Sequence, residues 1–184
     1  MKTNKTILGI CGSASKNSGN LALLKYLTEL GKADFNMELL DDLTELPHFQ
    51  TALTENNVPE KIIVLREKIT KADGVIICTP EYVFSIPSGL KNLLEWCVAT
   101  TVFSEKPVGL VTASASGVKG HEELKLIMET IQATFKEETT LLIQGIKGKV
   151  NTEGEISDKD TRNRLAKFLT AFVILTDEAG RDKS

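Results

Sequence analysis

The sequence predicts an α/β protein in which five parallel strands form one sheet with helices on both faces. Five short and almost wholly apolar runs occur along the chain, each followed by a segment whose apolar residues recur at helical spacing. Strands that are apolar along their whole length are typical of parallel sheets buried on both sides. The chain has 184 residues, the length of one ordinary domain, so residues 1–184 are expected to form a single domain.

The first half of the chain is expected to contain three strands. They are placed at Thr6–Cys11, Phe35–Leu40 and Gly74–Thr79. Leucines at positions 23, 24, 27 and 30 mark the helix after the first strand, and Gly31 is a suitable end for it. Pro59 opens the second helix, which runs to Lys71. The connection 41–57 is longer than most loops in compact domains, and loops of this length are often functional.

The second half repeats the pattern with two strands and three helices. The strands are placed at Pro107–Thr112 and Thr140–Gln144. Apolar stripes over residues 90–98, 124–135 and 165–173 mark the helices. The tail 177–184 is polar and is expected to fray.

The connections between the strands predict where a ligand would bind. Five strands, each followed by a helix, suit a doubly wound sheet of order 2-1-3-4-5, the flavodoxin-like arrangement. Ligands of such sheets bind outside the carboxyl ends of the strands, at the switch point between strands 1 and 3. Functional residues are therefore expected directly after strands 1, 3 and 4.

Composition and charge argue against several classes of protein. A net charge of −3 and a pI near 5.5 do not suit a nucleic-acid-binding domain, which usually has a basic excess. No apolar run approaches the roughly 20 residues that a membrane span needs, and the N-terminus lacks a secretory signal. The three cysteines lie far apart and form no disulfide framework, so a cytoplasmic protein is expected. We expect no metal, because His, Cys, Asp and Glu do not cluster at ligand spacing.

The segment after strand 1, from Gly12 to Asn20, has the composition of a phosphate-binding loop. We refer to it as the first loop. Its small residues let several backbone N–H groups converge, and the following helix adds the positive end of its dipole. Side-chain donors are available at Ser13, Ser15, Ser18 and Asn20, and Lys16 is the only cation. The alternative is an ordinary strand–helix turn with a serine N-cap.

Three better-known phosphate motifs do not fit the first loop. It lacks the Gly-Lys-Ser/Thr ending of the Walker pattern and the three spaced glycines of the dinucleotide fingerprint. A phosphatase loop beginning at Cys11 would need an arginine where Asn17 stands.

The segment after strand 3 combines prolines with aromatic residues. It runs Pro80-Glu81-Tyr82-Val83-Phe84-Ser85-Ile86-Pro87 and then enters the helix that carries Trp96. A stiff apolar loop with exposed backbone groups suits a flat aromatic ligand whose edge must be hydrogen-bonded. The alternative is a hydrophobic cover for the following helix, which is the more natural role for Trp96.

Together these segments resemble the NADPH-dependent FMN reductase family, which includes quinone, azo-dye and chromate reductases with a flavodoxin-like fold. The resemblance covers about residues 6–144, and the loop after strand 3 is its most specific part. It is carried by the serine-rich first loop, Leu46-Pro47-His48-Phe49, Ala72-Asp73-Gly74, and Pro80-Glu81-Tyr82 running to Leu90-Lys91-Asn92.

The resemblance implies an FMN cofactor and the residues that hold it. The first loop would hold the FMN phosphate, the loop Pro80 to Ser85 would contact the isoalloxazine ring largely through its backbone, and the turn after strand 4 would meet the pyrimidine edge. The residues so implied are Ser13, Ser15, Lys16, Ser18, Gly19, Asn20, Leu21, Pro80, Glu81, Tyr82, Val83, Phe84, Ser85, Ser114, Ala115, Ser116 and Gly117.

The sequence departs from the family pattern in several places. The turn after strand 4 keeps only two of the family's glycines, Gly117 and Gly120. Ser15 stands where the family usually has an arginine, and Lys16 is the neighbouring cation. Val83 replaces an asparagine and removes a polar side chain near the ring, which bears on substrate choice. Glu95 replaces an aspartate before the tryptophan.

The expected function is an FMN-dependent NAD(P)H oxidoreductase that passes electrons to a small acceptor such as a quinone, an azo compound or free flavin. The flavin performs the chemistry, so no catalytic side chain is expected. The alternative is a flavodoxin-type electron carrier without NAD(P)H-oxidising activity, but the net charge of −3 is mild for an acidic docking surface. A receiver-type signalling module would need an acidic pocket after strand 1, where Cys11-Gly12-Ser13 offers none.

Surface and assembly are the last expectations. The helix 88–99 is apolar over more of its circumference than one stripe requires, and Leu93 and Trp96 would leave an exposed patch. We expect a homodimer or homotetramer with this helix at or near the interface. The alternative is that Trp96 packs inside its own subunit against the long loop. His121 and the Glu122-Glu123 pair are expected to face solvent.

Overall fold

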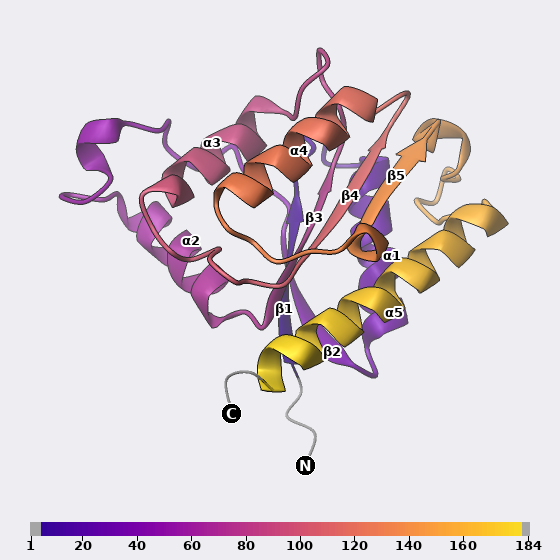
Figure 1. Cartoon of the computed structure of the whole chain (residues 1–184). Coiled ribbons are helices and arrows are strands. Elements are labelled where there is room, and N and C mark those ends of the chain that lie inside the picture. The colour runs from indigo at the N-terminus through magenta and orange to yellow at the C-terminus, as the bar shows by residue number, and fades with distance from the viewer. Residues whose placement is uncertain (1–4, 182–184) are drawn as a thin grey trace.

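The computed structural model describes residues 5–181, and its core is a parallel sheet (Figure 1). The strand order is β2-β1-β3-β4-β5, with every neighbouring pair parallel, so the predicted fold class and order are confirmed. The central strand β3 is buried at every residue. The strands are β1 (Lys5–Cys11), β2 (Phe35–Leu40), β3 (Gly74–Thr79), β4 (Val108–Ser114) and β5 (Thr140–Gln144).

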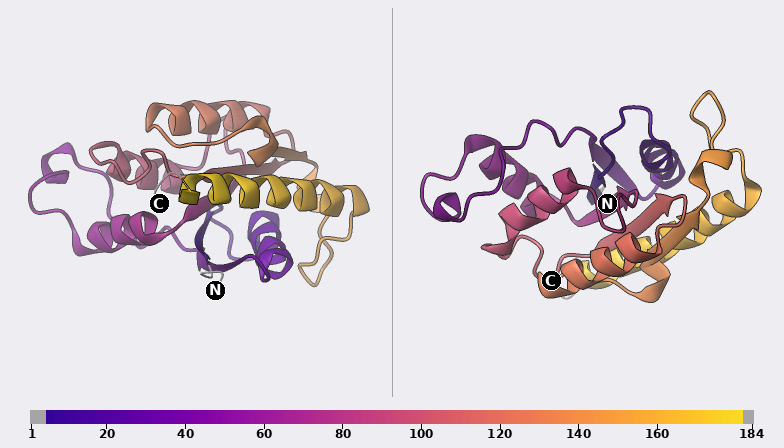
Figure 2. Two further views of the ribbon diagram at one scale, coloured as in Figure 1. Left: turned by 60° about the horizontal axis from the view of Figure 1, so that its bottom comes forward. Right: turned by 90° about the horizontal axis from the view of Figure 1, so that it is seen from above.

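Helices cover both faces of the sheet (Figure 2). Two of them, α1 (Gly19–Gly31) and α5 (Lys159–Arg181), pack on one face around Ile7, Ile76 and Val111. The other three pack on the opposite face around Leu8, Ile77 and Leu110. These are α2 (Glu60–Lys71), α3 (Ser88–Val98) and α4 (Val118–Thr130). Successive residues of the inner strands β1, β3 and β4 therefore serve two separate cores, which is why these strands are mostly apolar. In the edge strand β2, Phe35 and Met37 are buried whereas Asn36 and Glu38 are exposed.

Two predicted helix ends are wrong. The stripe 124–135 predicted a helix to Phe135, but α4 ends at Thr130 because Gln132 adopts φ 63° and the chain turns back toward β4. The N–H of Thr134 then bonds the carbonyl oxygen of Lys106 at 2.9 Å.

The tail beginning at Asp177 was expected to fray, but α5 continues to Arg181, and residues 182–184 lie outside the described chain. Glu178 pairs with Lys136 at 2.7 Å and Asp177 pairs with Lys5, so ion pairs fix this end of the helix. Smaller differences occur elsewhere: β4 begins and ends later than predicted, and Pro59 is the N-cap residue of α2 instead of its first turn.

The long connection between β2 and α2 is fastened to α3. Trp96 Nε1 and Asn92 Nδ2 both donate to the carbonyl oxygen of Pro47, at 2.8 Å and 3.0 Å, and the N–H of Phe49 donates to Asn92 Oδ1 at 2.7 Å. The rings of Phe49 and Trp96 meet edge to face at 5.3 Å. Leu93 and Trp96 are both 0% exposed. The exposed patch predicted at these two residues is therefore absent, and the alternative packing of Trp96 against the long loop is the observed one.

No helix among the described residues is both long enough and apolar enough to traverse a lipid bilayer.

Candidate functional site

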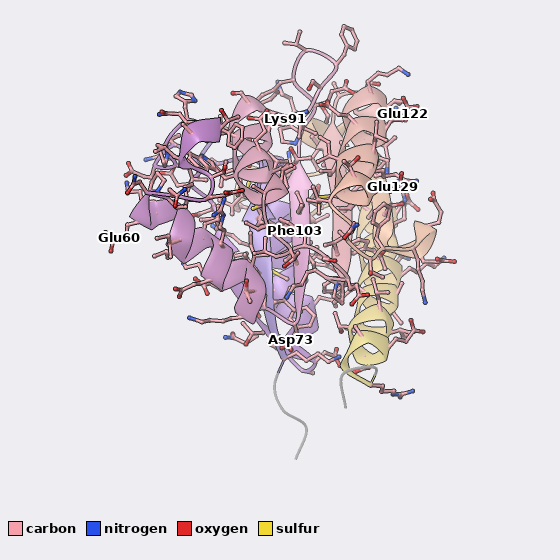
Figure 3. The ribbon with its side chains drawn as sticks, turned by 60° about the vertical axis from the view of Figure 1, so that its left-hand side comes forward. Glu60, Asp73, Lys91, Phe103, Glu122 and Glu129 are labelled. Atoms are coloured by element: carbon pink, nitrogen blue, oxygen red, sulfur yellow. The ribbon has the colours of Figure 1, made fainter. Side chains whose placement is uncertain are left out.

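A cavity of about 1200 Å³ lies at the carboxyl ends of β1 and β2 and beside the start of α3. Figure 3 shows Lys91, one of its lining residues, at the end of the molecule opposite Asp73, which precedes β3. The edge of the sheet at which the sequence predicted the site therefore contains a cavity large enough for more than one small ligand. Its lining residues are Gly12, Ser13, Ala14, Ser15, Lys16, Asp41, Asp42, Leu43, Thr44, Glu45, Leu46, His48, Phe49, Tyr82, Pro87, Ser88, Gly89, Lys91, Asn92 and Glu95.

The first loop wraps the N-terminus of α1 and leaves backbone donors available. Ser18 is the N-cap, and its hydroxyl oxygen accepts from the N–H of Leu21 at 3.1 Å. Within residues 5–181 the N–H groups at positions 14, 16 and 17 have no hydrogen-bond acceptor. Exposed N–H groups next to the positive end of a 13-residue helix suit an anion such as a phosphate. Both the phosphate interpretation and the serine N-cap are thus compatible with one geometry.

Asn20 does not serve as a free phosphate donor. Its Nδ2 donates to the carbonyl oxygen of Ala113 at 3.0 Å, and its Oδ1 accepts from Cys78 Sγ at 3.3 Å. The side chain is buried and ties α1 to β3 and β4. The sequence suggested a side chain in the loop, but Asn20 already belongs to the first turn of the helix, on the face that packs on the sheet.

All three cysteines are free and buried. Cys11 and Cys78 are register partners on the neighbouring strands β1 and β3. Burial raises the pKa of both thiols and raises the pKa of Cys97 to about 12. Cys11 Sγ lies 3.8 Å from Ser18 Oγ, so this thiol packs behind the first loop. A thiol with a raised pKa is mostly protonated at neutral pH and reacts slowly.

Lys16 is exposed and has an acidic neighbour across the cavity. Two hydrogen bonds from Thr44 lower the pKa of Asp42, and the charge of Lys16 lowers it further. The only cation of the first loop therefore also lies in the field of Asp42.

The loop after β3 forms a tight turn that projects beyond the strand ends (Figure 1). Tyr82 and Ser85 exchange two backbone hydrogen bonds of 2.8 Å and 3.0 Å, and the two residues between them have φ values of 51° and 60°. Two positive φ angles define a type I′ turn, which favours Asn and Gly. Here the positions hold Val83 and Phe84, with 92% and 77% of their surface exposed. Tyr82 OH lies 3.5 Å from Ser13 Oγ and joins this turn to the first loop.

Glu81 connects the loop after β3 to the N-terminus of α4. Its Oε2 accepts from the N–H of Gly120 at 2.8 Å, and its Oε1 accepts from the N–H of Gly117 at 3.3 Å. Gly117 is the N-cap position, has φ 84° and no side chain, so a carboxylate from another loop caps the helix. Ser114 Oγ also donates to the carbonyl oxygen of Glu81 at 3.4 Å.

Glu123 makes the reciprocal connection from α4 back to the loop after β3. Its carboxylate accepts from Ser85 Oγ at 2.6 Å and from the N–H of Ile86 at 3.1 Å, and it pairs with Lys91 at 3.3 Å. Burial alone would raise the pKa of Glu123, but these three donors outweigh burial and hold the pKa below its usual range. The expectation that Glu123 faces solvent is wrong. We call the contacts of Glu81 and Glu123 the carboxylate brace.

The turn after β4 lies beside the loop after β3 but not on the cavity wall. Ser114 is half-buried, Ala115 and Ser116 are exposed, and Gly117 is buried. His121, expected to face solvent, is half-buried with Nδ1 at 2.9 Å from Thr112 Oγ1. Burial lowers the pKa of His121. The structure thus brings the first loop and Tyr82 onto one cavity and sets residues 114–117 behind Glu81.

Comparisons with known proteins agree with this geometry. Residues 6–147 match the family model of the NADPH-dependent FMN reductases. A quinone reductase of Escherichia coli is 30% identical over 180 residues, which cover 94% of this chain and 95% of the relative. An NADH:(hydroxy)cinnamate reductase subunit of Vibrio ruber is 31% identical over 176 residues, covering 92% and 86%. The solved structure of a flavoenzyme NAD(P)H:(acceptor) oxidoreductase from Paracoccus denitrificans superposes with a TM-score of 0.80 at 26% identity, covering 95% and 98%.

Proposed function

The chain belongs to the NADPH-dependent FMN reductase family, and we propose that it is an FMN-dependent NAD(P)H oxidoreductase whose acceptor is a small molecule such as a quinone, an azo compound or free flavin. The observation that carries the proposal is the carboxyl-end cavity, which the first loop and Tyr82 both line. A phosphate-type loop and a stiff loop beside one cavity are what a flavin mononucleotide requires: an anion site and a ring site at a fixed separation.

In this proposal the first loop binds the FMN phosphate. The free backbone N–H groups at 14, 16 and 17 supply uncharged donors, and the hydroxyl groups of Ser13, Ser15 and Ser18 stand beside them. The first turn of α1, with Gly19 and Leu21, supplies the helix end. Lys16 adds one positive charge. These donors fit a phosphate without the arginine that the family usually has at Ser15.

The ring of the flavin would lie against the loop after β3, of which Tyr82 lines the cavity. Residues 80–85 would contact it through backbone groups, and residues 114–117, which lie off the cavity wall, would hold that loop in place through Glu81 and come close to the ring only at its edge. When bound, FMN supplies the hydride and electron chemistry, so this chain needs to bind, orient and shield the reactants. No side-chain acid or base is required. One cavity admits donor and acceptor in turn, which gives ping-pong kinetics.

The test has two stages. The protein freed of flavin is titrated with FMN while flavin fluorescence is followed, and the loaded protein is then given NADH or NADPH with a quinone. We expect saturable binding of one FMN per chain and nucleotide oxidation with parallel lines in double-reciprocal plots. Absence of FMN binding contradicts the proposal. FMN binding without nucleotide oxidation supports a flavodoxin-type carrier instead.

We propose further that the chain forms one FMN-binding domain that assembles as a homodimer or homotetramer in the cytoplasm. The helix α5, which follows the residues matched by the family model, packs on the same sheet and supports a single domain. The exposed apolar side chains of Val83 and Phe84, in the turn that also contains Tyr82 of the cavity wall, support self-association. Three unpaired thiols suit a reducing compartment. Light scattering tests the assembly: a mass near 20.1 kDa would mean a monomer.

A further inference from the structure

The cavity at the proposed flavin site carries more negative than positive charge. Its lining includes four carboxylates and two ammonium groups, so its formal charge is −2. The carboxylates are Asp41, Asp42, Glu45 and Glu95, and the ammonium groups are Lys16 and Lys91.

Both ammonium groups already interact with other anionic groups. Lys91 pairs with Glu123 at 3.3 Å, where it is part of the carboxylate brace. Lys16 lies in the first loop, where the FMN phosphate would take its charge, and it also acts on Asp42. A further anion entering the cavity would therefore meet no uncommitted cation on the lining.

The carboxylates differ in how far they are neutralised. Glu45 forms an ion pair with Lys61 on α2, and Asp42 accepts two hydrogen bonds from Thr44. Among residues 5–181, neither Asp41 nor Glu95 takes part in an ion pair. Asp41 follows the end of β2 and Glu95 lies on α3, so they approach the cavity from two different elements.

These charges distinguish the two nicotinamide nucleotides. NADPH differs from NADH by a phosphate on the adenosine ribose, and a phosphate monoester carries about −1.5 to −2 charges at pH 7. Sites that accept this group usually supply an arginine, whereas a carboxylate accepts hydrogen bonds from the free ribose hydroxyl groups of NADH. We propose that this chain oxidises NADH in preference to NADPH, with Asp41 and Glu95 as the specificity-determining residues. The inference rests on the proposed function.

The main test compares kcat/KM for NADH and NADPH with the FMN-loaded protein and a saturating uncharged quinone. We expect a preference of at least about tenfold for NADH at low salt, the size that about 1.4 kcal/mol of repulsion gives. The preference should shrink at high salt, because ions screen repulsion in an open cavity.

Charge substitutions locate the effect. Glu95→Lys should raise kcat/KM for NADPH about tenfold, because it adds a cation to the cavity wall, and should lower kcat/KM for NADH, because it removes an acceptor for the ribose hydroxyl groups. Asp41→Asn should shift the ratio of the two values in the same direction by a smaller factor. Glu129→Lys is the matched control, because Glu129 is an exposed carboxylate on α4 (Figure 3) and is absent from the cavity lining. We expect it to leave the ratio of the two kcat/KM values unchanged.

Binding gives a readout that does not depend on turnover. Adenosine 2′,5′-bisphosphate and 5′-AMP are titrated against the FMN-loaded protein by calorimetry. We expect the bisphosphate to bind more weakly than 5′-AMP to the parent protein, and Glu95→Lys to tighten the bisphosphate alone.

The outcomes separate this inference from the proposed function. Oxidation of both nucleotides with equal kcat/KM leaves the function standing and overturns the inference. A ratio that shifts as much with Glu129→Lys as with Glu95→Lys overturns the assignment to the cavity. If neither nucleotide is oxidised, the proposed function fails, and the inference fails with it.

Discussion

Replacing Val83 by asparagine should stabilise the protein. The residue has φ 51°, in the left-handed region that costs an L-residue about 1–2 kcal/mol and costs most for a β-branched side chain. Asparagine tolerates this region, and the Val83 side chain is 92% exposed, so its removal forfeits little packing. We expect Val83→Asn to raise the free energy of unfolding by about 1 kcal/mol, or Tm by about 2–4 °C in a chain of this size.

The assay is urea and thermal unfolding of the protein without flavin. Flavin binding to the folded state would otherwise add its own stabilisation. Val98→Asn is the matched control, because Val98 is 61% exposed at the end of α3 and has no positive φ. Val83→Gly should raise the free energy of unfolding less than Val83→Asn does, because glycine adds conformational entropy to the unfolded chain. If Val83→Asn gains no more than Val98→Asn, the turn does not have the left-handed geometry described for it.

Three further outcomes are expected. Glu123→Gln should lose about 1–2 kcal/mol of stability and weaken FMN binding. The folded-state pKa of Glu123 is lowered, so the parent should exceed this variant in free energy of unfolding by the full amount above about pH 4.3. That difference should be lost as pH falls further, and unfolding measured at several pH values will show it. Burial, followed by the charge of Lys125, lowers the pKa of His121. The free energy of unfolding of the parent protein should therefore fall as pH drops below about 6.5. His121→Gln should remove that part of the pH dependence in the same measurement. Trp96→Phe should lower the free energy of unfolding by about 1–3 kcal/mol, because it removes the hydrogen bond to Pro47 and part of the packing. Light scattering should give an unchanged oligomeric mass, because Trp96 is buried within its own chain.

The sequence predicted the strands well because their limits are marked chemically. The bounds of β2, β3 and β5 agree with the structure, since each apolar run there is followed by a charged residue, Pro80 or Gly145. Helix limits were harder to predict. Ile131 and Phe135 continue the helical spacing of α4, and only the left-handed conformation of Gln132 and the contact of Thr134 with Lys106 end the helix. Those contacts arise from tertiary packing, which periodicity does not encode.

The site could be located from sequence, but its internal connections could not. Loops that follow adjacent parallel strands must meet at one edge, so the meeting of Ser13 with Tyr82 follows from topology. The contacts of the carboxylate brace could not be predicted from the topology or the sequence. An acidic residue on a helix usually faces solvent, and nothing near Glu123 in the sequence indicates that its partners are Ser85 and Ile86.

The burial of Cys11, Cys78 and Cys97 has a practical consequence for spectroscopy. All three thiols are 2% exposed or less, and burial raises the pKa of each, so a thiol-directed dye will not label the folded chain. Ser88 is exposed, opens α3 and lines the cavity. A Ser88→Cys variant therefore has one reactive thiol, at the cavity wall, while the native thiols stay unlabelled. A fluorophore or spin label attached there would report the binding of each ligand without any native cysteine being removed.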